Sequence, residues 1–320
     1  MRWSRSSVRR ARDLLLTLCL AAGPLAAGDL PLAYVTCQNG NALSVLDLSS
    51  GQETARWDVP GNPAGVAWTR AGVYTVSPED KTVRRFDPDG TVAAQVTLDG
   101  GPIGIVVDEM RGRVYVSDWF NHRIWALSVD LEPVKSMETG ATPAGLALSD
   151  DGRWLASADK DADQISLFHA ETATLAARIP VGERPFGLQF APDGRLFVGN
   201  VGSNDVSVID TEAAHVTATI RVGERPYGVA FAQGRAFVTN QYANTVSVID
   251  LATLNPLTTI EVGEYPEGID VTPDGTTVVV ANWFENSVTL IDPLALTVTG
   301  IIETADGPRA FGPFIAGGLP

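Results

Sequence analysis

The apolar residues of this chain fall in short runs, separated by turn-forming residues at regular intervals. The clearest stretch is 222–250, where runs at 228–232, 236–239 and 245–250 are rich in β-branched and aromatic residues. Strands favour this composition. Apolar and polar side chains alternate only in part, as is typical of strands packed on both faces. No segment beyond the N-terminus combines helical periodicity with caps over a useful length, so the pattern predicts an all-β chain.

The same strand pattern recurs about every 40 residues, and a proline marks each copy. These anchor prolines are Pro63, Pro102, Pro143, Pro185, Pro226, Pro266 and Pro308, at steps of 39, 41, 42, 41, 40 and 42 residues. Two residues after the first six stand Gly65, Gly104, Gly145, Gly187, Gly228 and Gly268. We expect these glycines to supply backbone freedom where the chain enters a crowded inner strand. A repeat of this length with only strand-like content predicts a β-propeller, in which each repeat is one four-stranded blade.

The two ends of the chain supply complementary parts of one blade. Residues 32–59 provide the second, third and fourth strands of a repeat, whereas residues 308–316 have room for a first strand only. Joining them gives six continuous blades and one composite blade, which predicts a seven-bladed ring without exposed sheet edges. An open ring and an eight-bladed ring are the alternatives.

The first residues have the pattern of a secretory signal peptide. Five arginines precede a short apolar stretch at 14–22, and Ala26–Gly28 offers small residues for cleavage. The stretch is too short for a comfortable membrane span. We therefore expect residues 1–27 to be removed after general secretion, residues 28–320 to form the propeller domain, and the mature protein to be periplasmic or secreted. Twin-arginine export through Arg9–Arg10 and lipidation at Cys19 fit the pattern less well.

The charge of the chain argues against two classes of partner. The sequence has 23 Lys and Arg against 38 Asp and Glu. Removal of residues 1–27 takes away five arginines and one aspartate, leaving 18 basic and 37 acidic side chains and a formal charge of −19. Such a surface repels nucleic acid and anionic lipid at long range, so neither is favoured. We expect a monomer with no membrane span after cleavage.

Cys37 is the one cysteine left after processing, so no disulfide within the mature chain is possible. It stands where Asn200, Asn240 and Asn282 stand in other repeats. The simplest interpretation is a tolerated substitution in one blade, and a reactive or metal-binding thiol is the alternative.

Two strand motifs carry a family resemblance. Phe237–Asn240 followed by Thr245–Asp250 resembles the YVTN β-propeller repeat, as do residues 34–47, 197–210 and 279–292. Residues 114–127 resemble an NHL-type repeat through the run Asn-His-Arg-Ile. The broad similarity is to exported bacterial YncE-like proteins and covers essentially the whole mature chain. It implies a propeller fold and an exported location, and it leaves the activity open.

The usual catalytic and cofactor motifs are absent from the sequence. There is no zinc signature, haem attachment site, G-x-S-x-G element or P-loop, so we predict no cofactor and assign no catalytic residue. Alternating carboxylates at Asp159, Asp161 and Asp163 form a candidate calcium site. The loop lacks the glycine and the final glutamate of an EF-hand, so a solvated acidic loop is the default interpretation.

The strongest functional lead is positional. In a propeller, the connections that lead into first strands share a face with those between second and third strands. Both sets are rich here in aromatic residues and arginines, which are typical of recognition surfaces. The predicted ligand or partner face consists of Trp119, Phe120, Arg184, Phe186, Arg225, Tyr227, Tyr242, Tyr265, Glu267, Trp283, Phe284 and Arg309. Packing between blades is the alternative explanation for these aromatics.

Three functions follow as hypotheses. The first is an exported binding or scaffold protein that holds a protein partner or small ligand at the channel mouth. The second is a metal-assisted hydrolase or lyase of the lactonase kind, which needs carboxylates such as Glu267 or Asp118 to face the channel. The third is an accessory protein of a periplasmic quinoprotein or other redox system. Enzymatic activity is the less favoured interpretation.

Overall fold

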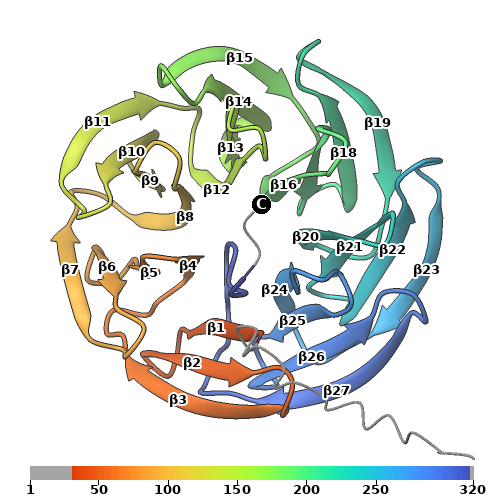
Figure 1. Ribbon diagram of the computed structural model, residues 1–320. Coiled ribbons are helices and arrows are strands. Elements are labelled where there is room, and N and C mark those ends of the chain that lie inside the picture. Colours follow the sequence, from red (N-terminus) through yellow and green to blue (C-terminus); the bar gives the residue numbers. More distant parts are fainter. Residues whose placement is uncertain (1–30, 318–320) are drawn as a thin grey trace, which may run out of the picture. The chain divides into compact units, whose positions relative to one another are not determined.

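The structure, a computed structural model, describes residues 31–317, and the predicted signal peptide at 1–27 lies outside them. These residues form an all-β ring of seven blades (Figure 1). The strands are β1 (Leu32–Cys37), β2 (Ala42–Asp47), β3 (Gln52–Asp58), β4 (Gly65–Thr69), β5 (Gly72–Ser77), β6 (Thr82–Phe86), β7 (Val92–Thr97), β8 (Pro102–Asp108), β9 (Arg113–Asp118), β10 (Arg123–Ser128), β11 (Pro133–Glu138), β12 (Pro143–Leu148), β13 (Trp154–Asp159), β14 (Gln164–His169), β15 (Thr174–Pro180), β16 (Pro185–Phe190), β17 (Leu196–Asn200), β18 (Asp205–Asp210), β19 (His215–Arg221), β20 (Pro226–Ala232), β21 (Arg235–Asn240), β22 (Thr245–Asp250), β23 (Pro256–Glu261), β24 (Pro266–Val271), β25 (Val278–Asn282), β26 (Ser287–Asp292) and β27 (Thr297–Glu303). A single 3₁₀ turn, Lys160–Ala162, is the one helical element within the described chain, and no helix there is long and apolar enough to cross a membrane.

Every blade is an antiparallel sheet whose first strand lies next to the central axis and whose last strand lies on the rim. Six blades are continuous in sequence, from β4–β7 to β24–β27. The inner strands are largely buried, whereas rim strands such as β3 and β11 are mostly exposed. The hydrophobic core therefore consists of clusters between the faces of neighbouring blades, rather than of one central cluster.

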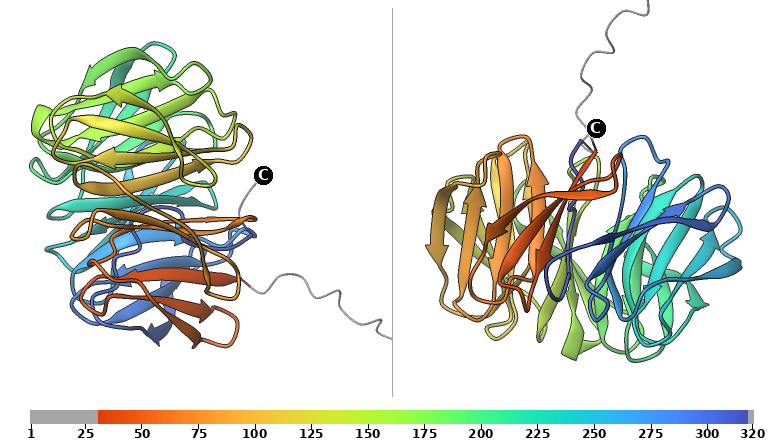
Figure 2. Two further views of the ribbon diagram at one scale, coloured as in Figure 1. Left: turned by 90° about the vertical axis from the view of Figure 1, so that its left-hand side faces the viewer. Right: turned by 90° about the horizontal axis from the view of Figure 1, so that it is seen from below.

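The remaining blade is composite, as the two chain ends predicted. Sheet β1–β2–β3 is completed by residues 308–316, the closing segment, which lies between β1 and β4 (Figures 1 and 2). Isolated bridges pair Ala33 with Ile315 and Cys37 with Pro308. Backbone hydrogen bonds include Tyr34 N to Phe314 O at 2.8 Å and Arg309 N to Thr36 O at 2.7 Å. The prediction of seven blades closed by a composite blade is confirmed.

The glycines after the anchor prolines have a different role from the one that the sequence suggested. None of the six has a positive φ, so backbone freedom is not what selects glycine. Instead, each lies against a backbone carbonyl of the next inner strand; a Cβ on Gly228 would stand 2.8 Å from Glu267 O, and a Cβ on Gly187 would overlap Tyr227 O. The missing side chain lets neighbouring inner strands approach closely around the axis.

The hydroxyl of the YVTN motif joins neighbouring blades. Thr239 Oγ1 accepts a hydrogen bond from Gly228 N of its own blade at 2.8 Å and donates one to Glu267 O of the next blade at 2.9 Å. Ser117 and Thr36 make the same pair of contacts in their blades. The most specific sequence motif of this chain is therefore architectural.

Candidate functional site

The two sets of connections singled out from the sequence do lie on one face, which we call the anchor face. Backbone hydrogen bonds join them directly: Trp119 N donates to Gly101 O at 2.8 Å, and Trp283 N donates to Tyr265 O at 3.0 Å. The opposite face carries the turns between first and second strands and is called the hairpin face. Within the anchor face, the predicted partner residues divide into a buried group and an exposed group.

The buried group forms an aromatic plug across the channel. Phe186 and Tyr227, each following an anchor proline, are 6% and 2% exposed. Their ring centroids lie 4.3 Å apart, and Phe311 of the closing segment lies 5.1 Å from Phe186. Ala144 completes this cluster. These rings close the channel at the anchor face, so Phe186 and Tyr227 do not present a surface to a partner as expected from the sequence.

A buried polar network adjoins the plug. Arg309 Nε lies 3.0 Å from Glu267 Oε2, and Arg309 Nη2 donates to Tyr227 Oη at 2.5 Å. Gln241 Nε2 donates to the other carboxylate oxygen of Glu267 at 2.5 Å. Burial raises the pKa of Glu267, and Arg309 opposes that rise. Burial also lowers the pKa of Arg309, but Glu267 and Tyr227 together outweigh burial, so the pKa of the guanidinium is raised. Glu267 and Arg309 thus form a buried ion pair beside the plug, although Glu267 Oε2 and Arg309 Nε make no hydrogen bond of regular geometry.

The exposed group forms a continuous aromatic surface, the aromatic ridge, which consists of Tyr242, Tyr265, Trp283 and Phe284. Successive ring centroids are 4.5–5.9 Å apart. Tyr242 and Phe284 are 51% and 55% exposed, and the other two are half-buried. Arg225 holds Tyr242 in place, because its guanidinium lies 4.6 Å from the ring centroid and donates to the hydroxyl at 2.6 Å.

Carboxylates stand beside the aromatic ridge. A shallow depression between blades is lined by Glu224, Tyr242, Asn244, Glu264, Tyr265 and Phe284. Glu224 and Glu264 are exposed, and Glu285, also exposed, accepts a hydrogen bond from Glu264 N at 3.2 Å. Burial and the hydrogen bond with Tyr242 raise the pKa of Tyr265 to about 12, so its hydroxyl is neutral. The ridge therefore combines large apolar rings, tyrosine hydroxyls and an acidic border.

The three other predicted residues lie elsewhere on the anchor face. Trp119 is half-buried against Phe186 of the plug, with a centroid distance of 6.0 Å. Phe120 is 69% exposed and belongs to neither group. Arg184 is exposed, and its backbone N donates to Asp163 at 2.8 Å.

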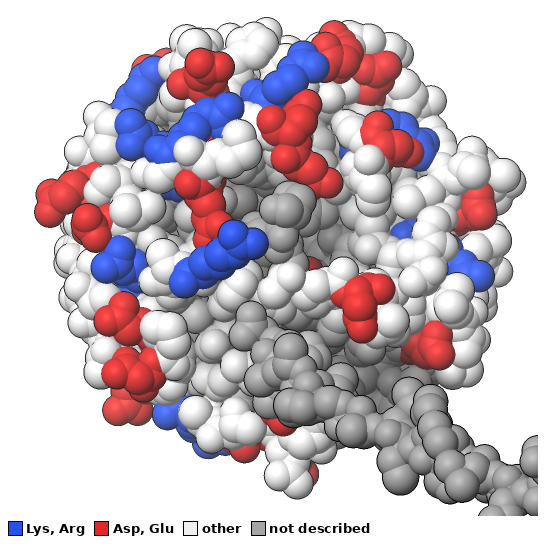
Figure 3. All heavy atoms as spheres, viewed as in Figure 1, with Lys and Arg blue, Asp and Glu red and all other residues white. Residues whose placement is uncertain are grey.

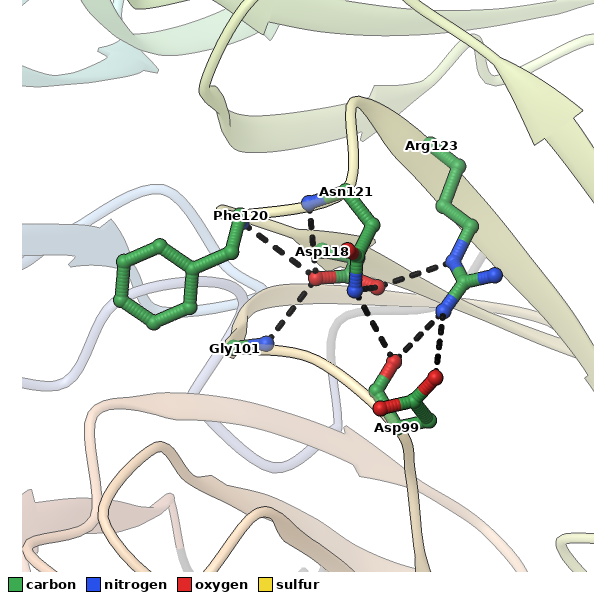
Figure 4. A network of polar contacts seen from close by, with 6 residues as sticks. All are labelled: Asp99, Gly101, Asp118, Phe120, Asn121 and Arg123. Carbon is green, nitrogen blue, oxygen red and sulfur yellow. Dashed lines mark hydrogen bonds and ion pairs between the residues drawn. The ribbon is translucent and has the colours of Figure 1, made fainter.

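Asp118, one of the carboxylates that a metal-assisted enzyme would need, is a structural capping residue (Figure 4). Its Oδ1 accepts hydrogen bonds from the backbone N atoms of Gly101, Phe120 and Asn121 at 2.9–3.3 Å. Its Oδ2 accepts from Arg123 Nε and Asn121 Nδ2, each at 2.9 Å. Although burial opposes ionisation, these donors hold the pKa of Asp118 below its usual range. The carboxylate is charged and fully engaged, and it does not face the channel as that hypothesis required.

The acidic residues of the candidate calcium site do not converge. Asp159 is buried and accepts hydrogen bonds from Gly140 N and Ser166 Oγ among others. Asp161 pairs with Lys160 at 2.7 Å, and Asp163 accepts from the backbone of Arg184. Among residues 31–317, no group of three or more potential ligands is placed to hold a metal ion.

Cys37 is buried against its own blade. Its Sγ lies 3.5 Å from Ser44 Oγ and 3.4 Å from Val35 O, and burial raises the pKa of the thiol. A buried neutral thiol is unreactive, which fits the interpretation of a tolerated substitution.

Sequence reasoning missed the central side chain of the plug, Phe311. One signal could have found it: in the last repeat Ala310 stands where every other repeat has glycine, and an aromatic residue follows it. The sequence does not show that this ring reaches across the axis to Phe186, because that contact spans blades far apart in the chain.

Comparisons with known proteins agree with this architecture. Residues 230–310 match the model of the YncE-like β-propeller family, whereas no curated protein sequence matches significantly. A functionally unknown protein from Desulfotomaculum acetoxidans DSM 771 superposes with a TM-score of 0.75 at 15% identity, over 89% of this chain and 98% of that one. Hydrazine synthase from Kuenenia stuttgartiensis gives 0.71 at 16%, over 79% and 89%. Virginiamycin B lyase from Staphylococcus aureus gives 0.67 at 16%, over 79% and 92%. At these identities the likeness concerns the fold alone.

Proposed function

We propose that this chain, a YncE-like β-propeller, is an exported binding protein that holds a protein partner on the aromatic ridge. The propeller scaffold serves many unrelated activities, so the function depends on the surface of this particular chain. The observation that carries the proposal is the cluster of Tyr242, Tyr265, Trp283 and Phe284, of which two side chains are more than half exposed. Aromatic side chains are enriched among the residues that anchor protein interfaces.

The ridge is also prepared for binding in a way that isolated exposed rings are not. Arg225 fixes Tyr242, and Trp283 and Phe284 contact each other with centroids 4.5 Å apart. Little side-chain freedom is lost when such a surface is covered. Phe120 lacks this support, which makes it a useful comparison.

The charge around the ridge indicates the chemistry of the partner. Glu224, Glu264 and Glu285 border it, and the whole chain is acidic. A partner segment that combines lysine or arginine with apolar side chains complements this surface, since opposite charges speed encounter and rings supply the affinity. A periplasmic redox enzyme is one class of partner that such a surface would serve.

Affinity capture from the exported proteins of the source cell tests the proposal. Tagged wild-type protein, Tyr242→Ala/Phe284→Ala and the control Phe120→Ala are compared by quantitative mass spectrometry after confirmation that all three are folded. We expect one partner to be enriched by the wild type and by Phe120→Ala and lost with the double variant. Equal enrichment by the double variant would remove the ridge as the binding surface.

No observation favours the metal-assisted enzyme. Its two candidate carboxylates, Glu267 and Asp118, are occupied by Arg309 and by Arg123 with backbone donors. The similarity to virginiamycin B lyase is one of fold, so it brings no catalytic residue to this chain.

A further inference from the structure

The channel that the plug closes at the anchor face opens on the hairpin face as a cavity of about 440 Å³. It is lined by the inner strands of the six continuous blades and by the closing segment. Figure 3 shows the hairpin face, with Lys and Arg as well as Asp and Glu side chains around its centre. The volume falls in the range of small-molecule sites.

Apolar side chains form most of the cavity wall. Phe311 and Glu267 lie at the inner end, where the plug separates the cavity from the anchor face. Trp68, Phe231 and Leu148 contribute half-buried side chains to the wall. An apolar and aromatic wall of this kind favours a ligand with an apolar body.

The charged residues of the cavity are all of one sign. Among the described residues that line it, five are acidic and none is basic: Asp108, Glu109, Asp150, Glu267 and Asp270. Asp108 and Glu267 have partners outside the lining, Arg111 at 2.9 Å and Arg309 at 3.0 Å. No ion pair within residues 31–317 involves Glu109, Asp150 or Asp270. The lining itself therefore carries negative charge and no positive charge.

Asp270 is fixed within this wall. Its Oδ2 accepts hydrogen bonds from Phe314 N at 2.8 Å and Ile315 N at 3.0 Å, and its Oδ1 accepts from Val271 N at 2.8 Å. Burial raises the pKa of Asp270 to about 6, and burial followed by the nearby Asp151 raises the pKa of Asp150. Ionised carboxylates in such surroundings gain stability from a bound positive charge.

We propose that the cavity binds a small organic cation, an ammonium group carried on an apolar or aromatic body. The carboxylates complement the charge, and the aromatic wall attracts both the body and the cation. A metal ion is the poorer fit, because the lining carboxylates are not gathered into a group of three potential ligands. This site is separated from the aromatic ridge by the plug, so it is independent of the proposed partner surface.

Three probes of nearly equal size and different charge test the proposal: 2-phenylethylammonium, 2-phenylethanol and phenylacetate, each titrated into the full protein by calorimetry at pH 7.5. We expect the ammonium to bind about tenfold more tightly than the alcohol, and phenylacetate not to bind. Equal affinity for the three, or preference for phenylacetate, overturns the proposal, as does failure of the ammonium to bind at millimolar concentration.

Two variants locate the site. Asp150→Asn removes a rim charge at an exposed position, and we expect it to weaken ammonium binding about threefold to tenfold. Leu148→Trp fills the cavity and abolishes binding. Asp306→Asn, which removes an exposed carboxylate next to an anchor proline on the other face, is the control and leaves affinity unchanged. Thermal unfolding verifies that each variant is folded; undiminished binding by folded Leu148→Trp places the ligand elsewhere and contradicts the inference.

Discussion

Carboxylates of the same type behave differently in this propeller because their donors differ. Asp118 is surrounded by backbone and arginine donors, which lower its pKa. Asp270 also accepts three backbone hydrogen bonds, but it lies in the wall of an apolar cavity, and desolvation raises its pKa to about 6. The sequence analysis named Asp118 as a candidate and did not name Asp270. The residues that bury Asp270 belong to another blade, so no local pattern indicates its burial. Such contacts follow from packing and not from a local motif.

The raised pKa of Asp270 predicts a pH dependence of stability. The folded state binds this proton more tightly than the unfolded state, so the contribution is complete below about pH 4 and is lost as pH rises through about 6. Relative to Asp270→Asn, whose side chain does not titrate, the wild type should lose about 2 kcal/mol of unfolding free energy between pH 4 and pH 7. Urea denaturation of both proteins across this range measures the difference. A constant difference would show that burial does not shift this carboxyl group.

At the level of the elements, the positions of the inner strands were predicted well, whereas the roles of the residues at their starts were predicted only in part. The anchor prolines, glycines and β-branched runs gave the strand order and the composite blade, because every repeat carries the same signal. The sequence did not show which residues of the predicted partner face are buried in the channel. Phe186 and Tyr227 follow their prolines as Glu267 and Ile103 do, and Phe311 of the closing segment completes their burial. The exposed ridge was part of the predicted face, and the cavity on the opposite face was not anticipated.

The close approach of inner strands predicts a strong effect of a single methyl group. Gly187→Ala places a Cβ against Tyr227 O, so the strands must separate, and we expect a loss of about 2–3 kcal/mol of unfolding free energy. Gly300→Ala on β27 is the control: its φ is ordinary and its nearest neighbour is Leu290 Cδ1 at 3.5 Å, so little change is expected. Chemical denaturation compares the two. Similar stabilities of the two variants would mean that neighbouring inner strands can accommodate a Cβ at Gly187 without loss of stability.

On the scale of the whole molecule, the ring has no disulfide to hold it closed and depends on the closing segment. That segment contributes the backbone of one inner strand, the ring of Phe311 in the plug, and Arg309 in the buried polar network. Closure and the sealing of the channel are therefore one event, since the same residues accomplish both.

Comparing Phe311→Ala with Phe120→Ala distinguishes the loss of a buried plug ring from the loss of an exposed ring. Phe311 is 7% exposed, and its loss leaves a void between Phe186 and Tyr227, which should cost about 3–5 kcal/mol. Phe120→Ala removes a ring that is 69% exposed and should change stability by less than about 0.5 kcal/mol. Thermal and urea unfolding measure both. If the two variants are equally stable, the plug does not hold the ring closed.

The composite blade also sets an order of events during synthesis. Ala310 N donates a hydrogen bond to Thr36 Oγ1, which lies 274 residues earlier in the chain. The composite blade therefore cannot be completed until the closing segment has been synthesised. Until then β1 has an open edge and the channel has no seal. Contacts between such distant residues make folding slow. A chain that ends early, by truncation or stalled translation, therefore leaves a ring that cannot shut, and its exposed edge marks it for aggregation or degradation.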